Sequence, residues 1–251
     1  MKHNFWFITI LFVLVFLIYP VGECYAQDFA IPKFNFVSRA ENPSEVTLTL
    51  QLFFLFTVLS FAPAIFLLTT SFARIIIVLS FLKRAAGLQE LPGQLIAGLA
   101  LFVTAMVMMP VWNEINETAL QPYLNKEIPQ GEALQRAGKP IRTFMLKQTR
   151  EKDIALFVYF SKMERPESPE NVPFYILAPS FVISEMKTAF IYGFLIYIPF
   201  LIVDLTVASV LLAMGMMVLP PIMISVPFKI ILFILVDGWY LVLRSLVGSF
   251  N

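Results

Sequence analysis

The stretch Met214-Gly215-Met216-Met217-Val218-Leu219-Pro220-Pro221 decides how the last third of this sequence folds. It separates two apolar runs, at about 188–212 and 222–243. Glycine and consecutive prolines interrupt helices, so the runs are predicted to form a helical hairpin with this stretch, the methionine bend, at its tip. Methionine is polarizable and has three rotatable bonds. A cluster of methionines at a bend suits a deformable constriction rather than a reaction centre, although methionine in apolar sequence more often only fills gaps in a core.

Two charges flank the methionine bend inside the apolar runs. Asp204 lies in the first run and Lys229 lies in the second. An ionisable side chain in an apolar segment is costly unless it is paired. If the runs pack antiparallel, Asp204 and Lys229 lie at similar depths, and we predict that they pair, within one subunit or between neighbours. The alternative is that each reaches an interface alone, for which Lys229 is long enough and Asp204 is too short.

Composition places the chain among membrane-associated proteins. Of its 251 residues 59% are hydrophobic, and the mean hydropathy is +0.79. The formal net charge is only +1, and no basic stripe carries interleaved aromatics, which argues against nucleic-acid binding. We therefore predict an all-α, membrane-associated fold of long apolar helical hairpins, with a small helical domain inserted between the second and third apolar segments.

The first 26 residues are typical of a cleaved signal peptide. Residues 5–19 are apolar, and small residues occupy the −3 and −1 positions of a cleavage site after Ala26. An uncleaved membrane helix is the alternative, but about 15 apolar residues are short for a span that needs about 20. The only cysteine, Cys24, and the only histidine, His3, lie in this segment. Cleavage would remove disulfides, thiolate nucleophiles, the usual metal ligands and a histidine base, so we predict neither an enzyme nor a cofactor.

The rest of the chain is predicted to have four parts. These are an extracytoplasmic leader (27–45), a first helical hairpin (46–112), an extracytoplasmic helical domain (113–187) and a second hairpin whose bend faces the cytoplasm (188–251). In the first hairpin, Pro63 is expected to break the apolar run into two helical pieces. Within the inserted domain, 143–163 is predicted to be one helix. The signal places the new N-terminus outside, so Lys83-Arg84 lie in the cytoplasm, as the positive-inside rule prefers.

Two further charged sites lie in apolar sequence. Arg74 is expected to point into a protein interior or toward backbone carbonyls rather than toward lipid. Glu185 and Lys187 are expected to open the third apolar segment. There Glu185 either caps a helix start, where negative charge is favoured, or contacts another subunit.

Four blocks follow one another along the chain: Ser71–Arg84, Gln94–Pro110, Pro179–Phe194, and Ala208–Lys229 with the double proline, after which comes Asp237-Gly238-Trp239. Together they resemble the FliP family of flagellar type III export-gate proteins. The likeness extends over nearly all of 46–250. It departs from the usual family pattern at Leu91-Pro92-Gly93-Gln94, at Val218, where another methionine is common, and at Ile191, where a polar residue is typical.

The resemblance implies a pentamer that, with the partners FliQ and FliR and other export proteins, forms an entry channel for unfolded flagellar subunits. It places this channel at the bacterial inner membrane, in the flagellar basal body, with the hairpins raised largely out of the bilayer lipid. Transport energy would come from other components, because the chain has no P-loop. The residues implied to act are the gasket Met214, Met216 and Met217, the buried ion pair Asp204 and Lys229, and the subunit contacts Phe144, Phe157 and Glu185.

Three other functions are weighed against this one. The corresponding subunit of a virulence injectisome would share the motifs, but those relatives are typically shorter and have no cleaved signal. An intramembrane aspartyl protease could use Asp204 and Asp237, yet neither lies in a Gly-x-Gly-Asp context. A small-solute transporter could use broken helices, but the sequence has no repeated halves.

Overall fold

The computed structural model describes residues 43–164, 166, 168–216 and 219–250, with side chains from residue 50 onward. The described residues form helices and contain no strand, which confirms the all-α fold. The predicted signal peptide and most of the leader lie outside them. The elements are α2 (Pro43–Thr69), α3 (Phe72–Ala85), α4 (Gly93–Ile115), the π-helix η1 (Asn116–Leu120), α5 (Gln121–Leu124), α6 (Gln130–Gln148), α7 (Glu151–Phe160), the 3-10 helix η2 (Pro169–Asn171), α8 (Phe174–Ala213), α9 (Pro221–Leu235) and α10 (Gly238–Gly248).

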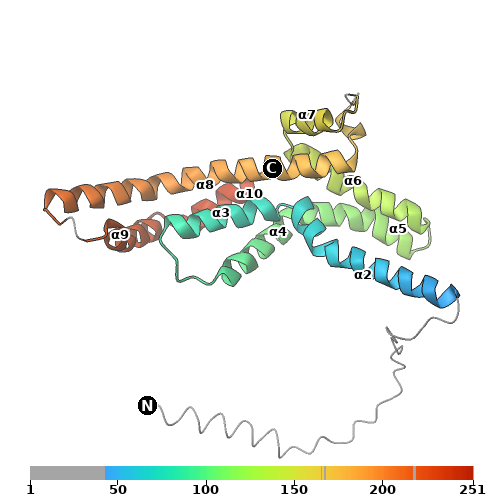
Figure 1. The fold of residues 1–251 in the computed structure, drawn as a ribbon, viewed down its shortest axis with the longest axis horizontal. Helices are drawn as coiled ribbons and strands as arrows, with labels where there is room; N and C mark the ends of the chain where they lie inside the picture. The colour runs from blue at the N-terminus through green and yellow to red at the C-terminus, as the bar shows by residue number, and fades with distance from the viewer. Residues whose placement is uncertain (1–42, 165, 167, 217–218, 251) are drawn as a thin grey trace, which may run out of the picture. The chain divides into compact units, whose positions relative to one another are not determined.

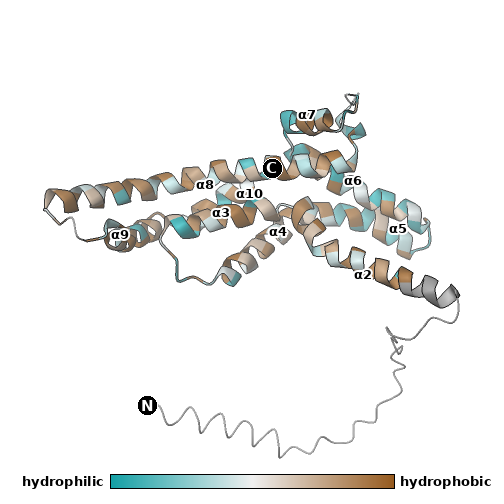
Figure 2. Cartoon of the chain, viewed as in Figure 1, coloured by the Kyte–Doolittle hydropathy of each residue, from teal (hydrophilic) through white to brown (hydrophobic). Residues whose placement is uncertain are grey.

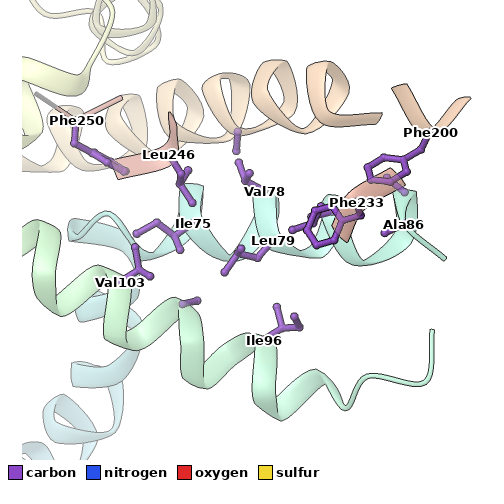
Figure 3. Close-up of a cluster of buried hydrophobic side chains, with 14 residues drawn as sticks. Ile75, Val78, Leu79, Ala86, Ile96, Val103, Phe200, Phe233, Leu246 and Phe250 are labelled. Atoms are coloured by element: carbon purple, nitrogen blue, oxygen red, sulfur yellow. The ribbon is translucent and has the colours of Figure 1, made fainter. Parts of the chain in front are cut away.

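The chain divides into two compact units, residues 1–54 and 55–251. In the larger unit, α3 packs against both α8 and α4 (Figure 1). Ile75, Val78 and Leu79 recur at helical spacing on α3 and are fully buried. Figure 3 shows that Ile96 and Val103 of α4 point toward this row. The core therefore lies where α3 is covered by the longer helices.

The contact between α3 and α8 depends on Gly193. A Cβ atom at this position would lie 2.6 Å from Cγ of Phe81, which is closer than real side chains approach. The ring of Phe81 occupies the space that a side chain at 193 would need. Glycine thus lets the two helices approach closely in the middle of α8.

The first apolar run breaks into two helices, but at Thr70-Ser71 and not at Pro63, which lies inside α2. The hydroxyl of Thr69 donates to the carbonyl of Ile65, and that of Thr70 donates to the carbonyl of Phe66, both at 2.8 Å. Hydroxyls that bond back to helix carbonyls compete with the helix ladder. The end of α2 is therefore set by hydroxyl residues rather than by the proline.

The predicted single helix over 143–163 is wrong, because two helices, α6 and α7, meet at an extended break at Thr149 and Arg150. The Thr149 hydroxyl donates to the carbonyl of Met145 at 2.6 Å. Both helices pack on the start of α8 around a second core. Its buried members are Met145, Val158, Val172, Ile176, Leu177 and Phe181.

The last two apolar segments also differ from the prediction. Helix α8 begins at Phe174 rather than near 188, because its first turns are buried against α6 and α7, and this packing outweighs the local effect of Pro179. The second segment is two helices, α9 and α10, bent by 66°. The bend lies at Asp237, whose φ is 50°. Gly238 follows it, since a Cβ there would lie 2.1 Å from the ring of Phe233.

Much apolar surface stays uncovered in the single chain. Within the described part of the chain, three helices are long and apolar enough to span a membrane, and the bent pair α9–α10 would make a fourth. Of the most apolar window in each of the three, only 6%, 28% and 11% is buried. Figure 2 shows that brown, hydrophobic residues prevail along α8 and α9, whereas teal residues are frequent in α6. These surfaces fit a membrane protein.

Candidate functional site

The methionine bend ends α8 with a Schellman motif. The backbone N–H of Gly215 donates to the carbonyl of Leu212, and that of Met216 donates to the carbonyl of Leu211, both at 3.0 Å. Gly215 has a φ of +74°, which glycine adopts without steric cost. The glycine therefore turns the chain directly after α8, and Pro220 leads it into α9.

The methionines of the bend project from the single chain. Met214 is 61% exposed and Met216 is 41% exposed. Met217 lies outside the described residues. The two described thioether side chains are thus available for contact with another chain.

The structure brings Asp204 and Lys229 together within one chain. Lys229 Nζ donates to Asp204 Oδ2 at 2.6 Å, and Ser225 Oγ donates to Asp204 Oδ1 at 2.5 Å. Lys229 and Ser225 lie one turn apart on α9, so they reach the same carboxylate from one face. Lys229 is only 4% exposed, and Ser225 is fully buried. This polar clamp joins α8 to α9 beside the methionine bend.

The protease alternative finds no support at this carboxylate. Both oxygens of Asp204 accept hydrogen bonds from the clamp, and Asp237 is not among their partners. Asp237 instead forms the left-handed break before α10. An aspartic protease needs two carboxylates that share a proton, and the described contacts of Asp204 do not provide this.

A second buried polar site surrounds Arg74. All five guanidinium N–H groups have acceptors. Nε donates to Glu185 Oε2 at 2.9 Å, and Nη2 donates to Glu185 Oε1 and, at 2.9 Å, to Gln148 Oε1. Nη1 donates to the carbonyl and the hydroxyl of Ser249, each at 3.0 Å. The guanidinium carbon also lies 4.0 Å from the ring centroid of Phe250. We call these five residues the Arg74 cluster.

Arg74 lies in the interior, and one of its acceptors is a backbone carbonyl. The helix-cap interpretation of Glu185 is wrong, because Glu185 lies well inside α8. Its side chain is fully buried in the single chain and forms an ion pair with Arg74. This pair was not predicted from the sequence. The signal was present, since two opposite charges stand in apolar runs where an unpaired charge is costly.

The two phenylalanines expected to contact other subunits are both half-buried. Phe144 of α6 packs edge-on against Phe181 and is stacked on Phe250, with ring centroids 6.0 Å and 6.4 Å away. Phe157 of α7 meets the edge of Phe160. Each side chain is partly held by its own chain and keeps some exposed surface.

A third buried polar contact, also missed from sequence, joins α7 to α8. Ser184 Oγ donates to Asp153 Oδ2 at 2.6 Å and accepts a hydrogen bond from the backbone N–H of Arg150 at 3.1 Å. These bonds fix the start of α7 on α8. The described residues contain no group of three or more His, Cys, Asp or Glu side chains that could hold a metal ion.

Known proteins resemble this chain over most of its length. The model of the FliP family matches residues 55–246. The flagellar biosynthetic protein FliP of Bacillus subtilis (strain 168) is 51% identical over 215 residues, which cover 85% of this chain and 97% of that protein. The proteins of the same name from Pectobacterium carotovorum subsp. carotovorum and Caulobacter vibrioides are 51% and 49% identical, over 81% and 80% of this chain and 80% and 76% of theirs. The chain therefore belongs to the FliP family.

Proposed function

We propose that this chain is a core subunit of the flagellar type III protein export gate, and that several copies of it surround the passage for unfolded flagellar subunits. The observation that carries the proposal is the methionine bend, whose exposed thioethers lie at a turn formed by Gly215. The Asp204–Lys229 ion pair holds the two helices that the bend connects. The chain also belongs to a family of flagellar proteins. The relatives named above are flagellar proteins, which supports the flagellar setting over an injectisome.

The uncovered helices support an assembly in or beside a membrane. A single copy leaves most of the apolar surface of α8 exposed, from Phe190 at 50% to Leu205 at 60%. Such patches are too large for a monomer in water and need lipid or other protein chains to cover them. We propose a pentamer completed by FliQ and FliR, located at the bacterial inner membrane in the basal body.

The methionine bends would act as the seal. Flexible thioether side chains can close around cargo of varied shape and yield as it passes. The polar clamp keeps α8 and α9 together next to the bend, so that the tip is held while its methionines stay adaptable. In this arrangement the bends face the cytoplasm, and the inserted domain (113–187) lies outside it.

Disulfide scanning tests whether the bends face one another. Cys24 is the only native cysteine and lies in the predicted signal peptide, so single cysteines can be placed cleanly elsewhere. Met216→Cys, in chains co-expressed with FliQ and FliR, should cross-link between copies under mild oxidation. Leu235→Cys, 78% exposed at the other end of α9, is the matched control and should cross-link less.

Mass measurement of the purified complex tests the stoichiometry. Native mass spectrometry of the tagged chain with FliQ and FliR should give five copies per complex. A monomer in all preparations, or cross-links at Leu235→Cys but none at Met216→Cys, would refute the proposed gate.

A further inference from the structure

Ser249 and Phe250, the two residues after α10, contact the guanidinium of Arg74 in the Arg74 cluster. Ser249 accepts from both N–H groups of Arg74 Nη1. A buried guanidinium needs an acceptor for each of its five donors, so without Ser249 two of the five would be orphaned. Ser249 also follows the C-terminal end of α10, where the helix dipole favours a cation.

Phe250 connects this cluster to α6. Its ring has the guanidinium of Arg74 4.0 Å from its centroid and is stacked on Phe144 with an interplanar angle of 22°. Its carbonyl accepts a hydrogen bond from Gln148 Nε2 at 3.1 Å. Phe144 and Gln148 lie one turn apart on the same face of α6. The segment Ser249-Phe250 therefore holds the last turns of α6 from two points.

We propose that Ser249-Phe250 is a positioning segment that fixes the end of α6, with Phe144, on the α3–α8 pair. Through this contact it sets the placement of Phe144 in the surface that meets a neighbouring subunit. The part of this inference that concerns the neighbour rests on the proposed function. The part that concerns α6 stands on the contacts within one chain.

The burial of the Arg74 cluster explains why a segment of two residues is sufficient to hold the end of α6. Arg74 and Glu185 are 2% and 0% exposed, so their hydrogen bonds do not exchange with water. Gln148 accepts from Arg74 and donates to Phe250, and so belongs to both halves of the network. Cation–π and aromatic contacts also gain strength when water is excluded.

Hydrogen exchange on the full chain, purified with FliQ and FliR, tests the positioning. Phe250→Ala removes the ring between Arg74 and Phe144 and should raise exchange at residues 141–148 about tenfold. Exchange in α9 should stay at the wild-type rate, because the ring and carbonyl of Phe250 contact Arg74 of α3 and Phe144 and Gln148 of α6. Phe250→Leu keeps apolar volume but loses the aromatic face, and should raise exchange at 141–148 by about threefold. Phe102→Ala, at a side chain that is 76% exposed, is the matched control and should leave 141–148 unchanged.

The fraction of chain in the oligomer is measured on the same preparations. Phe250→Ala should lower the fraction of chain in the oligomer severalfold. Equal increases in α6 and α9, no increase in α6, or full assembly of Phe250→Ala would overturn the inference. A wild-type chain that forms no oligomer would instead refute the proposed gate, and the exchange measurement would still test the positioning of α6.

Discussion

Asp204→Ala is the substitution whose effect on stability follows most directly from the structure. It removes the only ion-pair partner that Lys229 has among the described residues, while Lys229 is 4% exposed. Breaking a buried pair from one side leaves an uncompensated charge and costs about 3–5 kcal/mol. A protein of this size loses about 2–4 °C of melting temperature per kcal/mol, so Asp204→Ala should lower the midpoint by at least about 6 °C.

The opposite truncation should cost less. In Lys229→Met, Asp204 keeps the hydrogen bond from Ser225 at 2.5 Å, and its side chain is 21% exposed, so water reaches it. We expect a loss of about 1–2 kcal/mol. This asymmetry follows from the different burial of the two partners. A simple count of one broken ion pair would predict equal losses.

The assay is the thermal unfolding of purified chains in one detergent, followed by intrinsic fluorescence. Asp204→Lys combined with Lys229→Asp should recover part of the loss of Asp204→Ala, because opposite charges face each other again. Equal destabilisation by Lys229→Met and Asp204→Ala would contradict the difference in burial between the two partners, and no recovery in the exchanged pair would contradict their ion pair.

Replacing the three methionines of the bend by alanine should leave the complex assembled but leaky to small ions, and an unchanged membrane conductance would contradict the gasket. Gly193→Ala should cost about 1–3 kcal/mol in thermal unfolding, because the new Cβ would lie 2.6 Å from Cγ of Phe81. Wild-type stability of Gly193→Ala would show that α3 and α8 separate easily. Arg74→Lys keeps the charge, but an ammonium group cannot donate hydrogen bonds to all the buried acceptors of the guanidinium. It should therefore destabilise the chain by about 3 kcal/mol. Arg136→Lys, in a pair that is 41% and 44% exposed, is its control and should change stability by no more than about 0.5 kcal/mol. Equal effects of the two lysine substitutions would argue against the Arg74 cluster.

Periodicity and turn chemistry predicted the helical hairpin around the methionine bend. Glycine and double proline act on their own backbone, so their effect can be read without knowing the partners. The juxtaposition of Asp204 and Lys229 followed from the same reasoning, since both helices leave one bend in opposite directions. Residue types and local spacing were enough for both features.

The sequence predicted the helix boundaries less well. Pro63 and Pro179 lie inside helices, while Thr70 and Thr149 mark ends. A proline costs a helix a few kcal/mol, and buried apolar contacts along the same helix can outweigh this cost. The early start of α8 depends on side chains of α6 and α7, which no local pattern in α8 contains.

The sequence by itself determined the helical class, the family and the hairpin with the Asp204–Lys229 pair, because these depend on residue type and on neighbours close along the chain. Only the tertiary structure decided that Arg74, Gln148, Glu185, Ser249 and Phe250 form one buried cluster. Arg74 and Glu185 are 111 residues apart, and Arg74 and Ser249 are 175 apart. A buried guanidinium requires acceptors, but which acceptors it finds depends on how four helices pack.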